Sequence, residues 1–304
     1  MKFFLCFILI IFPLSKGMCA ACCGGGTSFP SLITGDFRSQ LNFTIGRSKL
    51  LGKKLAHQKK TKWSSPQKNK SQKVTLEMAH LFDNFYQIGI TFPYFFKQDH
   101  TQKTSQTAQN IGDIEVTGGY EFLPEMSYSL WKPRGILFTK VTFPTGKSIY
   151  DSDTVNTVEI TGEGLYKLAL GIGLLKVQGP WDAQILVEAH HSFQRSFLNN
   201  TFKVGPGYGM SALLALGYNP GNKRWRWGGS LAPHYEAAKT LTYNKKSIGS
   251  DYETYWDASF NASYLYSEKT TFNFSITDQT LFGPAHNTTL SRSFSVGVQK
   301  RWPL

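Results

Sequence analysis

The stretch WDASFNASYLYSEKTTFNFSIT, residues 256–277, places a large apolar side chain at almost every second position. A period of two residues indicates β-strands with two unlike faces. Trp256 and Phe260 share one face, whereas Asp257 and Asn261 share the other. A soluble sandwich would turn the aromatic face inward to a core, and a membrane barrel would turn it outward to lipid. The chain therefore has to be read for signs that separate these two folds.

The same alternation predicts about twelve strands. We expect them near Ser39–Lys49, Val74–Asp83, Phe85–Lys97, Ile111–Leu123, Gly135–Thr145, Leu165–Val177, Trp181–Gln194, Pro206–Asn219, Arg224–Glu236, Tyr252–Tyr266, Thr270–Leu281 and Leu290–Trp302. Long and short connections alternate along the chain nearly throughout. Outer-membrane barrels have this rhythm, with short periplasmic turns and long outer loops, whereas a Greek-key sandwich has no reason to keep it. The predicted fold is all-β: a closed antiparallel transmembrane β-barrel of about twelve strands, after an N-terminal signal peptide.

Aromatic residues gather toward the ends of these strands. An interfacial girdle in a membrane barrel predicts that placement, whereas a soluble core would favour large rings at strand middles. The aromatic face of the opening stretch is therefore assigned to lipid and the polar face to the lumen. We expect the following residues at the lipid interface: Tyr86, Tyr94, Trp181, Tyr208, Trp225, Trp227, Trp256, Tyr264 and Trp302.

Residues 1–21 have the features of a signal peptide. Lys2 precedes an apolar run, Phe3–Leu14, which suits a signal sequence and is short for a spanning helix. The prediction is an exported protein of the bacterial outer membrane. A short periplasmic segment is expected at 22–38 and the barrel at 39–304.

The four cysteines all lie within the first 23 residues. No disulfide can therefore cross-link the body of the chain, and the fold must depend on its own packing. If cleavage follows Ala21, Cys22 becomes the first residue and is a candidate for lipidation.

The formal net charge is +13, and much of the excess lies in residues 47–73, a segment without any acidic residue. A basic run can bind nucleic acid, but an exported chain rarely meets it, so no nucleic-acid partner is expected. We expect a basic extracellular loop that is solvated and poorly ordered. The alternative is contact with anionic lipid headgroups or surface polysaccharide, such as lipopolysaccharide.

Four short motifs follow one another in the middle of the chain: Phe92-Pro93-Tyr94, Gly112-Asp113, Pro144-Thr145-Gly146 and Gly179-Pro180-Trp181. In this order they resemble the family of outer-membrane transporters named after the MetA pathway of phenol degradation. The resemblance covers about residue 76 to the C-terminus and departs from the family at the basic segment and the two-cysteine N-terminus. It implies an outer-membrane barrel that moves small apolar compounds.

The polar face carries both acids and bases. The residues expected to line the lumen are Glu115, Glu121, Lys140, Lys167, Asp182, Glu188, His190, Arg224, Arg226, His234, Glu253, Asp257 and Arg301. A closed barrel of about twelve strands has a backbone diameter of about 24 Å, so side chains leave a narrow passage or none. These charges could form a selectivity lining or pair with one another as a structural filling.

Three functional interpretations stay open. The first is a passive channel or transporter for small compounds, apolar or aromatic ones among them. The second is a non-conducting structural or surface-interaction barrel. The third is remote: His190 and Ser192 have the spacing found in outer-membrane phospholipase A, but the alternation places both inside the barrel. We expect membrane lipid and a small permeant as partners, and no enzyme activity, catalytic residue, cofactor or metal.

Overall fold

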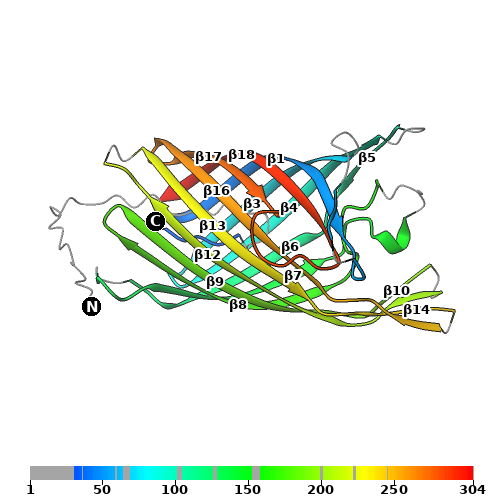
Figure 1. The fold of residues 1–304 in the computed structure, drawn as a ribbon. Helices are drawn as coiled ribbons and strands as arrows, with labels where there is room; N and C mark the ends of the chain where they lie inside the picture. Colours follow the sequence, from blue (N-terminus) through cyan, green and yellow to red (C-terminus); the bar gives the residue numbers. More distant parts are fainter. Residues whose placement is uncertain are drawn as a thin grey trace, which may run out of the picture.

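A single antiparallel sheet closes on itself into a barrel (Figure 1). The computed structural model describes residues 31–303 apart from 36, 59, 64–68, 101–104, 126–128, 153–157, 199–200, 222–223 and 245. The signal peptide and Cys22 lie outside the described residues. The last strand pairs with the first along a ladder that runs from Phe37 opposite Pro303 to Lys54 opposite Thr288, so the sheet has no open edge at this seam.

Twelve transmembrane strands form the wall, which confirms the predicted fold and strand number. β5 and β6 both pair with β4 and together count as one of the twelve. In chain order the transmembrane strands are β1 (Phe37–Lys54), β3 (Asn69–Phe82), β4 (Tyr86–His100), β5 (Ser105–Ile111) with β6 (Ile114–Leu123), β7 (Arg134–Phe143), β8 (Lys167–Gln178), β9 (Trp181–Ser192), β12 (Gly207–Tyr218), β13 (Trp225–Glu236), β16 (Glu253–Ser267), β17 (Thr270–Asp278) and β18 (Thr288–Pro303).

Six smaller elements of the described chain lie outside this pattern. Four short strands form a separate sheet that extends past the wall at the right of Figure 1: β10 (Arg195–Phe197), β11 (Phe202–Val204), β14 (Thr240–Tyr243) and β15 (Lys246–Gly249). β2 (Lys62–Trp63) pairs with the end of β1. A single turn of 3-10 helix spans Ile149–Asp151. Within the described part of the chain, no helix is long and apolar enough to cross a membrane.

The basic segment 47–73 is not a loop over its whole length. β1 continues to Lys54 and β3 begins at Asn69, and the two strands remain paired as far as Lys49 opposite Lys70. The expectation of a poorly ordered loop was wrong for these two ends of the segment. The alternation of small polar and basic residues there still has a period of two, and that period was hidden because both faces are polar.

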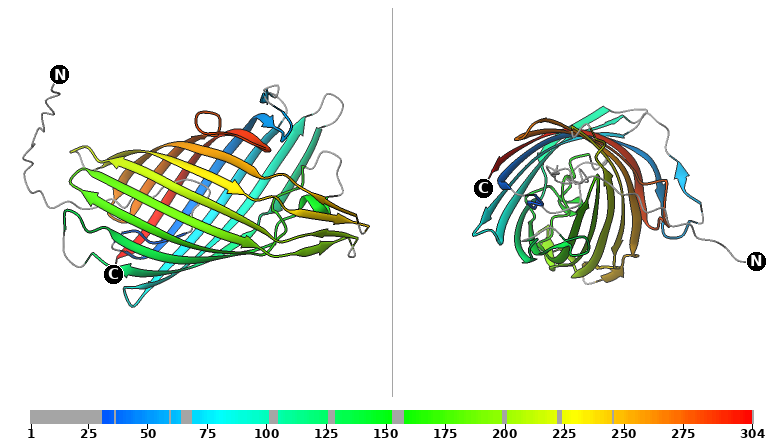
Figure 2. Two further views of the ribbon diagram at one scale, coloured as in Figure 1. Left: turned by 60° about the horizontal axis from the view of Figure 1, so that its bottom comes forward. Right: turned by 90° about the vertical axis from the view of Figure 1, so that its left-hand side faces the viewer.

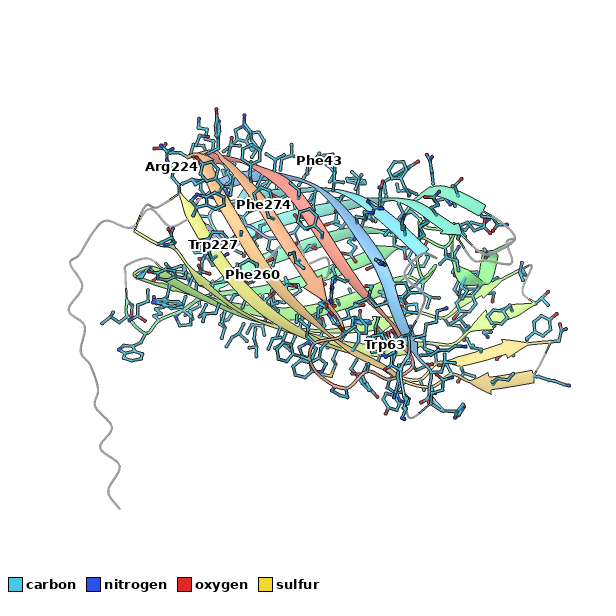
Figure 3. All side chains as sticks on the ribbon, turned by 45° about the horizontal axis from the view of Figure 1, so that its top comes forward. Phe43, Trp63, Arg224, Trp227, Phe260 and Phe274 are labelled. Atoms are coloured by element: carbon cyan, nitrogen blue, oxygen red, sulfur yellow. The ribbon has the colours of Figure 1, made fainter. Side chains whose placement is uncertain are left out.

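The outer wall is apolar. Phe43, Phe260 and Phe274 lie on the outside of the barrel (Figure 3), and their exposed fractions are 40%, 53% and 36%. A contiguous apolar outer surface of this kind is stable in lipid and not in water. The chain is therefore a transmembrane β-barrel with outer-membrane architecture.

Aromatic side chains mark both ends of the apolar surface. Tyr208 and Tyr218 stand at the two ends of β12, ten residues apart. That separation is about 33 Å along the strand and about 25 Å along the barrel axis at a tilt near 40°. The interface residues of the sequence analysis all occupy outward positions. Three of them contact one another: Trp225 stacks on Trp227, with ring centroids 5.4 Å apart, and contacts Tyr264, with ring centroids 4.9 Å apart.

Candidate functional site

The inward face of the wall carries the ionisable residues. Figure 2 (right) looks along the barrel and shows the strands surrounding this interior. Of the thirteen lumen candidates, twelve stand at inward positions of the strands. Arg224 is the exception, because it precedes β13 and is exposed at the rim with the short turns (Figure 3).

Residues 31–34 enter the barrel at its short-turn end. Ser31, Leu32 and Ile33 have exposed fractions of 4%, 8% and 1%. The expectation that residues 22–38 form a segment in the periplasm was therefore wrong for this part, which lies inside the barrel. We call residues 31–34 the lumen segment.

Hydrogen bonds fix the lumen segment to the inner wall. The amide of Ile33 donates to Gln87 Oε1 at 2.6 Å, and Gln40 Nε2 donates to the Leu32 carbonyl at 3.0 Å. The Ser31 hydroxyl donates to the carbonyl of Met78, and Arg134 donates to the carbonyl of Thr34. Side chains of β1, β4 and β7 thus bond to the backbone of this segment, and the Ser31 hydroxyl bonds to β3.

Glycine on β4 makes room for the lumen segment. A Cβ at Gly89 would overlap the carbonyl group of Ser31, whereas a Cβ at Gly46 on β1 would meet its nearest atom at an ordinary 3.6 Å. The glycine at position 89 therefore permits a close approach of backbone to backbone.

Leu32 extends across the lumen and joins an apolar cluster from the opposite wall. The cluster comprises Leu32, Ile136, Phe138, Leu175, Leu186, Leu213 and Ala232, which come from β7, β8, β9, β12 and β13 besides the lumen segment. Every one of these side chains is at most 8% exposed. Apolar side chains from two sides thus meet inside the barrel and form a floor near its short-turn end.

Buried ion pairs surround this floor. Arg226 donates two hydrogen bonds to Asp182, at 2.6 Å and 2.5 Å, and both residues are at most 5% exposed. Arg134 pairs with Glu121 at 2.5 Å. Paired carboxylate and guanidinium groups satisfy each other here, since an unpaired charge would be costly in such a dry place.

Above the floor, toward the long loops, lies a cavity of about 170 Å³. Its lining includes Glu115, Lys140, Lys167, Glu188, His190 and His234. Several of these side chains are paired: Lys140 with Glu188 at 2.9 Å, His190 with Glu236 at 2.7 Å, and His234 with Asp257 at 3.2 Å. The cavity is therefore a vestibule whose walls carry charges of both signs.

The described parts of the connection between β7 and β8, residues 144–152 and 158–166, appear green in Figure 2 and contribute Glu163 to the lining of the vestibule. Asp113 accepts the backbone N–H groups of Gly146 and Glu163, at 2.9 Å and 2.8 Å. Glu163 pairs with Lys167 at 2.5 Å and with Lys239 at 3.6 Å. Burial raises the pKa of the Glu163 carboxyl, but the two ammonium groups outweigh it and leave the pKa below its ordinary value.

The remaining lumen candidates take structural roles at the two ends. Glu253 accepts a hydrogen bond from Thr288 at 2.6 Å, on the long-loop side. Arg301 donates to Gln299 at 2.6 Å near the short-turn end, and Gln299 donates in turn to Gln40. Gln40 also holds the lumen segment, so this chain of hydrogen bonds links the seam of the barrel to its floor.

The His190 and Ser192 pair does not form a nucleophile with its base. The hydroxyl of Ser192 is fully buried and donates to the carbonyl of Gly207 at 3.3 Å, while His190 turns to Glu236. Both residues face the lumen and not lipid, as the sequence predicted. In the described part of the chain, no group of three or more His, Cys, Asp and Glu side chains could hold a metal ion.

Sequence reasoning missed the lumen segment and several lining residues, among them Tyr255 and Glu236. Tyr255 and Glu236 share inward parity with Asp257 and His234, so the alternation contained the signal. The lumen segment has no such signal, since four residues of mixed polarity do not show which surface they contact.

The fold has a counterpart among solved structures. The COG4313 outer membrane channel from Pseudomonas putida F1 matches with a TM-score of 0.67 at 12% sequence identity, over 90% of this chain and 98% of that one. The NanC porin is more distant, with a TM-score of 0.49 at 11% identity over 86% and 99%. No family model and no curated protein matches the sequence. At 12% identity the likeness to the first of these structures shows the fold alone, a closed outer-membrane β-barrel.

Proposed function

We propose that the protein is a passive channel of the bacterial outer membrane whose lumen is closed at the periplasmic end by residues 31–34. The observation that carries this proposal is the nature of the floor. It is completed by a segment that belongs to no strand, so the segment can leave the lumen without breaking any pairing of the wall. A barrel built only to be solid would be filled by side chains of its own strands.

The permeant class is inferred from what the lumen segment covers. Departure of Leu32 would expose the apolar side chains of Ile136, Phe138 and Leu186 along the passage. We propose small compounds with an apolar or aromatic part, which pass the charged vestibule first. The resemblance to the transporter family of the MetA pathway points in the same direction, and the solved channel of similar fold is consistent with it.

The alternative is a structural barrel that conducts nothing. The observation that favours it is the contact between Leu32 and the opposite wall, together with the buried Asp182–Arg226 pair, which fill the lumen at this level. The two functions differ in one property, since only a channel has a floor that can be displaced.

Conductance in planar bilayers tests the proposal. The variant Gly89→Ala inserts a methyl group where the Ser31 carbonyl lies and should displace the lumen segment, whereas Gly46→Ala adds the same group at ordinary contact distance. We expect a low conductance for the parent and for Gly46→Ala, and a several-fold higher one for Gly89→Ala. Absence of conductance in all three folded proteins would establish the non-conducting barrel instead.

A further inference from the structure

The outer wall carries a group of cations just above its apolar surface, at the long-loop end of β1. Lys49 on β1 stands directly opposite Lys70 on β3 on one side and opposite Arg292 on β18 on the other. All three side chains are exposed and occupy outward positions. Three cations therefore form one row across three neighbouring strands.

More cations continue the row along the chain. Lys53 on β1 stands opposite Lys62 on β2, and Arg47 lies two residues below Lys49 on the same face. We call Arg47, Lys49, Lys53, Lys62, Lys70 and Arg292 the cation patch. Cross-strand partners lie within about 5.5 Å of each other, at which distance like charges destabilise a sheet.

An acidic residue compensates for one of these three cations, since Arg292 is paired with Asp278, at 2.6 Å. Among the residues that the structure describes, no carboxylate lies within ion-pair distance of Lys49 or Lys70. Two neighbouring lysines that are fixed by strand pairing without a carboxylate partner are the arrangement expected of a site for an anion from outside the chain.

The height of the cation patch along the barrel axis shows which part of the membrane it faces. Arg292 is ten residues from Trp302 along β18, which is about 33 Å along the strand and about 25 Å along the axis at a tilt near 40°. That height equals the apolar band of an outer-membrane barrel. The patch is thus level with the headgroups of the leaflet opposite the short turns. The residues below it are apolar, among them Phe294, which stands opposite Arg47.

We propose that the cation patch binds the phosphate groups of anionic lipids in the outer leaflet, such as those of lipopolysaccharide. Lysine supplies point charges for phosphate, and the guanidinium of Arg47 can donate two parallel hydrogen bonds. The apolar wall below receives the acyl chains of the same lipid. The inference rests on the proposed orientation, with the long loops outside, and is independent of conduction.

The test titrates the folded full-length protein in detergent with lipopolysaccharide and measures the bound fraction by native mass spectrometry. The double variant Lys49→Gln/Lys70→Gln removes the centre of the patch. The matched control is Lys203→Gln/Lys246→Gln, which removes two exposed lysines from the separate sheet of β11 and β15. A cation near an anionic surface contributes about 1 kcal/mol, or about fivefold in affinity, so the double variant should bind about thirtyfold more weakly.

Three results would overturn the proposal: equal affinity of the double variant and the parent, equal affinity of the parent for dephosphorylated lipopolysaccharide, and competition by inorganic phosphate at the lipid's own concentration. The last result would indicate a free-phosphate site. The single variants, each expected to lose about fivefold, replace the double variant if it does not give the folded band on a gel. An unchanged conductance of the double variant separates this result from a failure of the channel proposal.

Discussion

At the scale of single residues, charged side chains that are buried and paired stabilise the interior of the barrel. Asp182 and Arg226 form the most complete pair, with two hydrogen bonds and little exposure of either side chain. Removal of one partner from such a pair leaves the other as an uncompensated charge, which is far more costly than loss of an exposed pair.

Asp182→Ala should therefore lower the free energy of unfolding by about 3 kcal/mol. The control is Glu125→Ala, which breaks the more exposed pair with Lys176 and should cost less than about 1 kcal/mol. Urea titration of both variants in lipid vesicles, followed by tryptophan fluorescence, gives the two values. Equal costs would mean that water reaches the Asp182–Arg226 pair.

The sequence identified most of these residues but not their partners. The alternation placed Asp182, Lys140, Glu188 and Arg226 on the inner face. A shift of one residue would have turned the apolar side chains of the same strands inward instead. Which acid meets which base depends on the register between strands that are distant in sequence. That register follows from turn geometry and barrel tilt, which no periodicity shows.

At the scale of the element, each strand separates lipid from lumen by parity alone. Phe274 on β17 faces outward and is 36% exposed, whereas its neighbour Asn273 accepts a hydrogen bond from Ser263 inside the barrel, at 2.9 Å. Neighbouring residues of one strand therefore experience entirely different surroundings.

Phe274→Arg should cost roughly 2–4 kcal/mol of stability in lipid, because it places a charge near the middle of the bilayer. Asn273→Arg should cost much less, since its side chain extends into the polar lumen. The measurement is the yield and stability of folding into lipid vesicles. The reverse order of the two variants would mean that the aromatic face is packed inside.

The β7–β8 connection should loosen in acid. Since the pKa of Glu163 is below its ordinary value in the folded protein, its contribution to stability is complete above about pH 4.3 and is lost as the pH falls through the lowered pKa. The Glu163 side chain is 53% exposed, so this contribution is less than about 1 kcal/mol.

Glu163→Gln should consequently unfold at a lower temperature than the parent at pH 7, and this difference should shrink as the pH falls through the lowered pKa of Glu163. Thermal unfolding of both proteins in detergent over a series of falling pH values measures the difference. A difference that stays constant over the whole series would show that Glu163 acts through something other than its charge.

At the scale of the whole molecule, the two ends of the barrel are distinct. Leu55 follows β1 at the long-loop end with 49% exposure, and Trp131 lies in the connection between β6 and β7 at the short-turn end with 90% exposure. The proposed orientation puts Leu55 at the cell surface and Trp131 in the periplasm.

In intact cells, a membrane-impermeant maleimide should label Leu55→Cys and should label Trp131→Cys only after lysis. The parent protein, with its own cysteines, gives the background. Labelling of Trp131→Cys alone in intact cells would show that the barrel has the opposite orientation. The cation patch would then face the inner leaflet.

The architecture was largely predictable because twelve amphipathic strands and the alternation of loop lengths repeat one signal many times. The additions to the barrel were not predictable for the opposite reason. β10 and β11 are three residues each, too short for any periodicity. The paired parts of the basic segment alternate only between polar residues, so neither face looked buried.

The lumen segment also constrains how the barrel assembles. Its hydrogen-bond partners Gln40, Met78 and Gln87 belong to β1, β3 and β4, the first three transmembrane strands of the chain. These strands can therefore hold the segment before the later strands have formed. Pairing of β18 with β1 then encircles it. A bulky domain fused just before residue 31 would have to pass through or remain beneath this ring, so we expect insertion of such fusions to stall with the seam unclosed.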